Sequence, residues 1–256
     1  MRIALAFFGL PRCSAIAFPS IAQNLVAPLA AEGELRVFCH LWRQPWIFNP
    51  RSRENHAQPE ENYAPFLGFD TMVEPRPERP SPLFQRLRTF GDAWQDGFHS
   101  LANLVLQLHS LADVTRRLAA AAPDVVVFAR PDLLYHEPVQ AQDLLRALQR
   151  PAEITLPAWE SWGGYNDRFA IAGPRLARVY GERLAGALAY CEATGQPLHS
   201  ESFLRATLHA AGAGVRPIGL RASRVRVDGR LEAEDFEGRR TPLAGVRPAG
   251  TGPRGP

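Results

Sequence analysis

Lysine is absent from this 256-residue chain, and arginine supplies all 29 of its permanently basic side chains. The planar guanidinium group suits phosphate and carboxylate groups, which it can bind through two parallel hydrogen bonds. Abundance over the whole chain does not identify a ligand, so each arginine has to be judged by its position.

Cysteine is scarce as well: the chain has three, Cys13, Cys39 and Cys191, and none of them form a CxxC pair. This number and spacing indicate neither a disulfide framework nor a zinc site. Unpaired cysteines are typical of proteins in a reducing compartment.

Long apolar runs are missing too. The longest candidate, residues 101–118, is interrupted by polar side chains, namely Gln107, His109, Asp113, Arg116 and Arg117. Residues 3–10 begin like a signal peptide, but Pro11 and Arg12 interrupt them before they reach the length of one. We therefore expect a cytoplasmic protein.

The basic charge is confined to one end of the chain. Residues 237–256 hold four arginines and one glutamate, which equals the whole net charge of +3, so residues 1–236 are neutral. This distribution does not favour a nucleic-acid partner. The last residues are glycine, proline and arginine without a core pattern, which predicts one domain over 1–236 and a disordered basic tail over 237–256.

The N-terminal forty residues indicate the fold class. Residues 3–9 form an apolar run of strand length, a helix is expected over about 19–31, and a second strand over 35–41. This βαβ order is typical of a parallel sheet, and a first strand that is apolar on both faces is expected to be covered by helices on each side. Residues 43–82 lack periodicity and predict a long loop or insertion.

The rest of the chain continues the alternation of helices and strands. The apolar stripe of residues 92–122 predicts a helix that packs on the core. The remaining expected elements are a strand at 124–129, a helix at 140–149, strands at 153–156 and 168–172, helices starting at Pro174 and Ser200, and strands near Val215 and 224–227. We therefore expect an α/β fold with a mainly parallel central sheet flanked by helices, of the Rossmann-like or GT-A-like kind.

Ligands of open α/β sheets bind beyond the carboxyl ends of the strands. The first polar cluster at such a place is Gly9 to Ser14. Gly9 allows a ligand to approach the backbone, Arg12 suits a phosphate, and the following helix offers its N-terminus. The alternative is a tight turn that carries a surface arginine.

The second cluster is Arg130-Pro131-Asp132, directly after the strand at 124–129. A carboxylate there is well placed to hold Mg²⁺ or Mn²⁺ together with a diphosphate, and the metal would stabilise the departing nucleotide. The alternative is that Asp132 caps a turn or helix.

The third cluster joins the loop before Asp167 to the helix that starts at Ser200. Trp159 and Trp162 are suited to stacking on a sugar ring, and Asn166 and Asp167 end the same loop. Glu201 is the second candidate carboxylate, although the helix dipole alone would also explain an acid in the first turn. As the acceptor-side base we expect Asp167 before Glu201, and we expect His199 and His209 to be surface or packing residues.

Together these segments resemble bacterial GT-A-like glycosyltransferases of polysaccharide biosynthesis. The resemblance lies in five segments spread over residues 1–236, namely FFGLPR, VFCHLW, FARPDLLY, WGGYNDRFAI and HSESFL. It implies a nucleotide-sugar donor, a glycan or lipid-linked acceptor, and a DxD motif that binds metal and diphosphate at a strand end.

The resemblance also implies where the site residues face. Gly9, Arg12 and Asp132 would face the donor, while Asp167 and Glu201 would face the acceptor or the reacting carbon. Arg130 stands where the first aspartate of the DxD motif would be, so metal dependence is in question, because Arg130 can itself neutralise a diphosphate.

Two other interpretations stay open. The segment FFGLPRCS also resembles the phosphosulfate-binding loop of sulfotransferases, although the usual Gly-Thr and lysine or threonine are missing and Arg130 lacks the paired serine. A non-catalytic relative that binds a glycan or a protein is the other alternative. Peripheral contact with the inner face of the membrane is a further expectation, because polysaccharide acceptors are often lipid-linked and the basic tail suits an anionic surface.

Overall fold

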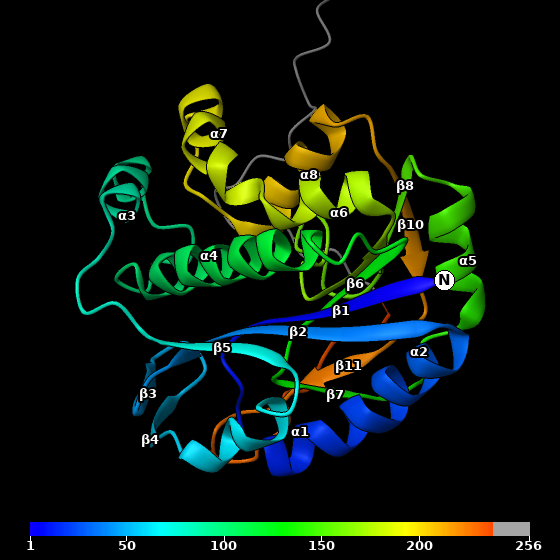
Figure 1. Cartoon of the computed structure of the whole chain (residues 1–256). Coiled ribbons are helices and arrows are strands. Elements are labelled where there is room, and N and C mark those ends of the chain that lie inside the picture. The colour runs from blue at the N-terminus through cyan, green and yellow to red at the C-terminus, as the bar shows by residue number, and fades with distance from the viewer. Residues whose placement is uncertain (238–256) are drawn as a thin grey trace, which may run out of the picture.

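Seven strands form the central sheet of the computed structural model, which describes residues 1–237 (Figure 1). In spatial order they are β10 (Gly214–Ile218), β8 (Glu153–Pro157), β9 (Phe169–Ala172), β6 (Val125–Ala129), β1 (Arg2–Gly9), β2 (Glu34–Arg43) and β5 (Asp70–Pro75). β9 alone runs antiparallel to its neighbours, β6 and β8. The predicted α/β fold with a mainly parallel sheet is therefore confirmed.

β1 lies near the middle of this sheet because its side chains are apolar on both faces. Successive side chains of a strand point to opposite faces. Ala4, Ala6 and Phe8 pack in one core cluster, while Leu5 and Phe7 pack in the other. Figure 1 shows the helices that cover these faces: α4, α6, α7 and α8 lie on one side, and α1 and α2 lie on the other.

The first helix begins earlier than predicted. α1 spans Ser14–Ile21, passes through a π-helical turn at Ala22–Val26, and continues as α2 (Ala27–Glu32). The start at Ser14 depends on Asn62, whose side-chain oxygen accepts from the Ser14 amide at 2.9 Å, while the Ser14 hydroxyl donates to the Asn62 carbonyl at 2.6 Å. A partner 48 residues away in the chain leaves no local signal.

One helical stretch among the described residues, Ser14–Glu32, has the length and composition of a membrane span. Our sequence analysis did not single it out, because it considered residues 101–118 as the longest candidate. In this fold 33% of the stretch is buried, including Ile21, Leu25 and Leu29, which pack in the core.

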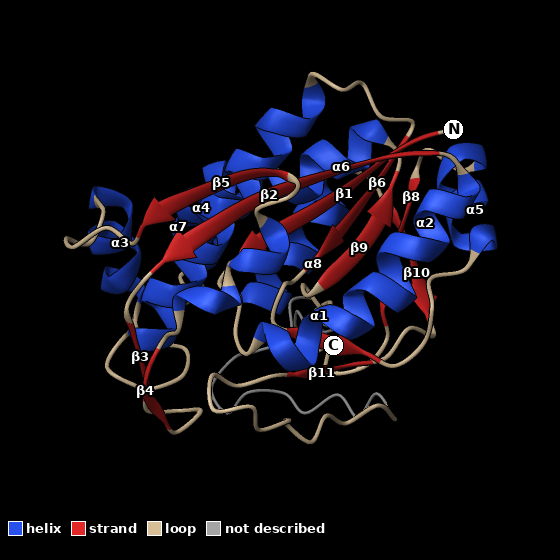
Figure 2. Cartoon of the chain, turned by 60° about the horizontal axis from the view of Figure 1, so that its bottom comes forward, coloured by secondary structure: helices blue, strands red, loops and turns tan. Residues whose placement is uncertain are grey.

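Residues 43–82, predicted to be a long loop or insertion, contain regular structure. They form the hairpin of β3 (Trp46–Asn49) and β4 (Glu54–Ala57), two short 3-10 turns (Glu60–Asn62 and Ala64–Phe66) and the edge strand β5. β5 pairs only with β2 and is partly exposed, so its sequence DTMVEP lacks the apolar pattern of a central strand. Figure 2 shows the hairpin beyond the ends of β2 and β5.

The long predicted helix is shorter than expected. α4 spans His99–Ala119, and its apolar stripe is buried in the core, as predicted. Residues 92–98 form a turn instead, because the Asp92 carboxylate accepts from the backbone amides of Trp94, Asp96 and Phe98.

The remaining elements complete the flanking layers. The other helices are α3 (Pro82–Leu87), α5 (Ala141–Gln149), α6 (Pro174–Gly181), α7 (Ala187–Thr194) and α8 (Ser200–Ala210), with 3-10 turns at Arg88–Phe90 and Arg183–Gly186. β7 (Leu133–Tyr135) and β11 (Ala222–Arg224) form a separate antiparallel pair. The strand predicted at 224–227 is thus shifted toward the N-terminus, and the predicted disorder of residues 238–256 lies outside the described residues.

Candidate functional site

A cavity of about 480 Å³ opens at the carboxyl ends of the central parallel strands. Its walls include Gly9 at the end of β1, Trp42 near the end of β2 and Arg130 directly after β6. Gly9 has a φ of 103°, in the left-handed region that favours glycine, and the chain turns there toward the cavity wall. The location is the one expected for ligands of open α/β sheets.

The cavity brings together five of the predicted site residues and leaves out four. Gly9, Arg12, Arg130, Asp167 and Glu201 all line it. The four that do not line it are Asp132, Trp159, Trp162 and Asn166.

Arginine dominates the charged part of the cavity wall. Nine arginines line it, namely Arg12, Arg51, Arg53, Arg76, Arg130, Arg168, Arg224, Arg226 and Arg230. The lining carboxylates are four: Asp92, Asp167, Glu201 and Glu232. This excess of positive charge in a concave site favours an anionic ligand.

Asp132 holds two of these arginines in place. Its carboxylate accepts from Arg130 Nε at 2.8 Å and Arg130 Nη2 at 2.7 Å, and it also accepts from Arg12 Nη1. Burial alone would raise the pKa of Asp132, but the charges of Arg130 and Arg12 outweigh it and hold the pKa well below its usual range. Asp132 is therefore an ionised anchor for Arg12 and Arg130, which themselves reach the cavity.

The surroundings of Asp132 do not fit a divalent metal. Both carboxylate oxygens are occupied by guanidinium groups and the residue is 1% exposed. Among residues 1–237 no three histidine, cysteine, aspartate or glutamate side chains come together as a metal-binding group. Mg²⁺ and Mn²⁺ prefer several oxygen ligands, and the surroundings of Asp132 do not offer them.

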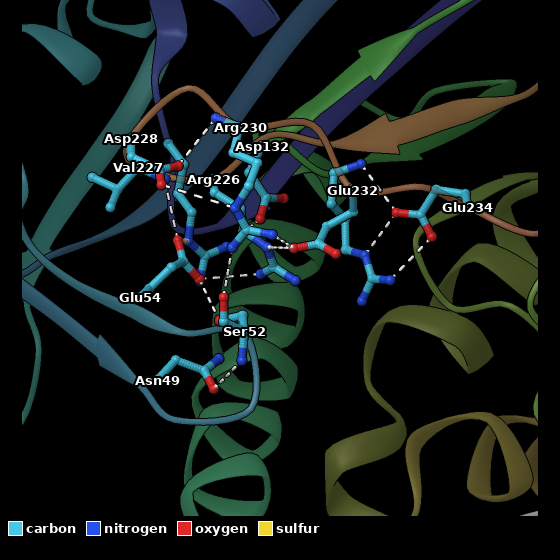
Figure 3. A network of polar contacts seen from close by, with 12 residues as sticks. Asn49, Ser52, Glu54, Asp132, Arg226, Val227, Asp228, Arg230, Glu232 and Glu234 are labelled. Atoms are coloured by element: carbon cyan, nitrogen blue, oxygen red, sulfur yellow. Dashed lines mark hydrogen bonds and ion pairs between the residues drawn. The ribbon is translucent and has the colours of Figure 1, made fainter.

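A second group of ion pairs fixes the wall that the C-terminal segment supplies (Figure 3). The buried Glu54 carboxylate contacts Arg226 Nη1 at 3.1 Å and Arg12 Nε at 3.4 Å. Arg226 also donates to Glu232 at 2.8 Å, and Arg224 donates to Glu234 at 2.7 Å. The hairpin β3–β4 and residues 222–234 are thereby linked across one side of the cavity.

Asp167, another residue of the cavity wall, is held in place by hydrogen bonds. It accepts from Gln107 Nε2 at 2.8 Å and from the Ser200 hydroxyl, and Arg183 lies nearby at 3.9 Å. Burial opposes the ionised form, but the charge of Arg183 and the Ser200 hydrogen bond lower the pKa of Asp167 below its ordinary value. Asp167 is thus ionised near neutral pH and already engaged as a hydrogen-bond acceptor.

Glu201 differs from Asp167 although it lies in the same cavity wall. Burial, and after it the negative charge of Asp167, raise the pKa of Glu201 to about 8. His199 Nε2 lies 3.2 Å from its carboxylate, and burial lowers the pKa of His199 to about 4. Both groups are therefore mainly uncharged at pH 7, and Glu201 can take up or release a proton near neutral pH.

Gly164 fixes the backbone around Glu201. A Cβ atom at position 164 would lie 2.0 Å from the Glu201 carbonyl oxygen, so only glycine fits there. The neighbouring Tyr165 amide donates to that same carbonyl at 3.1 Å. The loop rich in glycine and tryptophan therefore positions Glu201.

The tryptophans of that loop have other roles than the predicted stacking in the cavity. Trp159 is 3% exposed and donates its indole N–H to the Leu220 carbonyl at 2.9 Å. Trp162 packs edge-on against Trp94, with 5.8 Å between ring centroids. Asn166 is buried and braces the loop through the Trp159 carbonyl and the Arg168 amide.

Sequence analysis missed several residues that line the cavity. Trp94 lies in the predicted helix at 92–122, and Arg51 and Arg76 lie in the predicted loop at 43–82. The guanidinium carbon of Arg51 lies 3.4 Å from the centroid of the Trp94 ring, and Arg76 donates to Gln44 at 3.0 Å. For Arg51 and Arg76 the only local signal was an arginine-rich composition, which does not distinguish a ligand-binding side chain from a solvated one.

Neither of two comparisons with known proteins gives a match. No protein-family model matches the chain, and no curated protein matches it significantly.

Proposed function

We propose that the chain is a glycosyltransferase that moves a sugar from a nucleotide-sugar donor to a glycan or lipid-linked acceptor in surface polysaccharide synthesis. GT-A-like folds are mainly parallel sheets with the donor at the carboxyl ends of the strands, and the observed sheet is compatible with one. The observation that carries the proposal is a single cavity that combines an arginine-rich wall with two carboxylates of opposite pKa shift.

The arginine-rich wall supports an anionic donor. A nucleotide sugar carries its negative charge on phosphate, and more negative charge develops on the leaving phosphate as the sugar departs. Guanidinium groups fixed before the reaction stabilise such charge without reorganisation.

The carboxylate pair supports the acceptor side of the reaction. The acceptor hydroxyl has to lose its proton as its oxygen bonds to the anomeric carbon, while the bond from that carbon to the phosphate oxygen breaks. A base with a pKa near the working pH is the more effective catalyst. In our proposal Glu201 therefore accepts this proton, and Asp167, already bonded to Gln107 and Ser200, keeps the pKa of Glu201 high and orients the site.

The assignment of Glu201 as base reverses the order expected from sequence, in which Asp167 came first. Sequence analysis placed both residues in the same polar cluster, so their position did not distinguish them. The difference lies in their partners, because Arg183 and the Ser200 hydrogen bond outweigh the burial of Asp167, whereas the charges of Arg168 and Arg51 do not outweigh the burial of Glu201 and its repulsion by Asp167.

A sulfotransferase remains the second interpretation, and the geometry gives it less support. A phosphosulfate donor of that kind would need the loop from Gly9 to Ser14 and the amides of the following helix. The Ser14 amide and hydroxyl are both bonded to Asn62, and of the loop only Gly9, Leu10 and Arg12 line the cavity.

A non-catalytic relative that binds a glycan or a protein is the third interpretation. It would have no need for a proton acceptor with a pKa near 8 inside the cavity. Substitution of Glu201 by glutamine separates the two, because it would abolish sugar transfer by an enzyme and leave binding to a partner intact.

The first experiment is a thermal-shift screen of the purified protein with UDP, GDP, CDP, CMP and adenosine 3′,5′-bisphosphate. A ligand that binds only the folded state raises the melting temperature. We expect stabilisation by one nucleoside diphosphate or monophosphate, followed by its release from the matching nucleotide sugar in a transfer assay. Stabilisation by the bisphosphate alone would contradict the proposal and favour the sulfotransferase.

A further inference from the structure

Six of the nine arginines that line the cavity are already paired with carboxylates. Their partners among the described residues are Asp132, Glu54, Glu160, Glu232, Glu234 and Asp228. Most of these carboxylates belong to the network that fixes the C-terminal wall (Figure 3). The charge of these six arginines is therefore largely balanced before any ligand arrives.

Arg51, Arg53 and Arg76 line the same cavity without an ion pair among residues 1–237. Two of them are held in place by neutral partners. Arg51 stacks on Trp94 and contacts the Ser100 hydroxyl at 3.4 Å, and Arg76 is bonded to the Gln44 side chain. Enclosure in the cavity and the nearby charge of Arg224 lower the pKa of Arg51, and the charges of Glu201 and Asp96, neither of which forms an ion pair with it, do not offset this.

The lining carboxylates are all engaged elsewhere and leave no ligand set for a metal. Asp92 accepts from three backbone amides of its own turn. Glu232 binds Arg226 and Arg230, and Asp167 binds Gln107 and Ser200. Glu201 is buried beside His199 and is protonated below a pH of about 8.

We propose that the cavity binds the phosphate groups of its donor through Arg51 and Arg76, without a divalent cation. The inference rests on the proposed function, since it specifies how the leaving group is held. When the bond between the anomeric carbon and the phosphate oxygen breaks, that oxygen keeps the electron pair, and the guanidinium groups of the cavity wall balance the charge of the departing phosphate groups. A pair of side chains held in advance loses little conformational freedom on binding.

The test measures binding of inorganic pyrophosphate and of the nucleoside diphosphates UDP, GDP and CDP, by thermal shift and titration calorimetry, in EDTA and in Mn²⁺. We expect pyrophosphate and one nucleotide to bind in EDTA, with little gain from Mn²⁺. Arg51→Gln and Arg76→Gln should each weaken binding about tenfold or more, because each removes a hydrogen bond between charged groups.

Arg175→Gln is the matched control. Arg175 is exposed and does not line the cavity, and among residues 1–237 it has no carboxylate partner and donates only to the Ala211 carbonyl. Its substitution should leave both dissociation constants unchanged, and an equal loss in all three variants would overturn the assignment of Arg51 and Arg76.

The outcomes separate this inference from the proposed function. Nucleotide binding that requires Mn²⁺ overturns the inference and leaves the glycosyltransferase standing. Pyrophosphate binding in EDTA without binding of any nucleotide supports the anion site and counts against the proposed function. No binding of any of these probes overturns both.

Discussion

Asp132 lies behind the cavity wall and Glu201 lies in it, and the surroundings of these two buried carboxylates give them opposite properties. Asp132, at the end of β6, accepts from Arg12 and Arg130, and its pKa lies far below the ordinary value. Glu201, at the start of α8, has an uncharged His199 beside it, and its burial and the repelling Asp167 outweigh the charges of Arg168 and Arg51, so its pKa is about 8. Burial raises the pKa of a carboxylate unless cations compensate, so the neighbours decide that Asp132 is ionised and that Glu201 retains its proton up to about pH 8.

The largest expected effect follows from removal of the anchor. Asp132→Asn leaves two guanidinium groups beside an uncharged amide, and breaking a buried pair in this way costs about 3–5 kcal/mol in the free energy of unfolding. Urea denaturation of the variant and of the wild type measures it. The exposed Arg2–Asp124 pair is the control, since Asp124→Asn should change stability little.

The contrast between Asp132 and Glu201 would not hold if Asp132 were a metal ligand. In that case Asp132→Asn would leave the stability of the metal-free protein nearly unchanged and would abolish a Mn²⁺-dependent rise in melting temperature. We expect no such rise in the wild type.

The next effect concerns turnover. Glu201→Gln keeps the shape of the side chain and removes the proton acceptor, so the rate of sugar transfer should fall about 100-fold or more, the usual contribution of a general base. In the wild type kcat/KM should rise with pH through an apparent pKa of about 8. Binding of the nucleotide product to the variant should stay unchanged, and a parallel loss of binding would contradict the assignment.

A smaller effect is expected in the pH dependence of stability. The pKa of Glu201 is about 8 when folded and near the ordinary 4.5 when unfolded, so the folded protein retains a proton between these values. Stability contributed by this proton is present at low pH and is lost as the pH rises through about 8. The melting temperature of Glu201→Gln minus that of the wild type should therefore increase from pH 5 to pH 9.

The smallest of the four effects tests whether Trp159 has a structural role and no contact with a ligand in the cavity. Trp159→Phe removes the hydrogen bond to the Leu220 carbonyl and should cost about 1–3 kcal/mol in stability. Since Trp159 does not line the cavity, the KM values for donor and acceptor should not change. A rise in the KM for the acceptor would restore the predicted stacking role.

Much of this site could be predicted because it follows from local sequence. An apolar strand followed by a polar turn is a local pattern, and Gly9, Arg12 and Arg130 were found from it and do line the cavity. The order of strands and helices was predictable for the same reason. The antiparallel direction of β9 was not, because the direction of a strand depends on how its connections cross the sheet.

The partners of each charge could not be predicted, because they come from distant parts of the chain. Arg12 and Asp132 are 120 residues apart, and Arg226 and Glu54 are 172 apart. Which arginine remains without a counter-ion depends on all such pairings at once. The roles of Asp132 and of Arg51 therefore appear only in the folded chain.

The side of the cavity that Arg224, Arg226 and Arg230 line forms late while the chain is synthesised. The last strand of the central sheet, β10, ends at Ile218, and these arginines follow it. As the chain leaves the ribosome, the whole sheet can form while Glu54 still lacks Arg226. This side of the cavity wall is thus the last one to be completed as the described chain is synthesised.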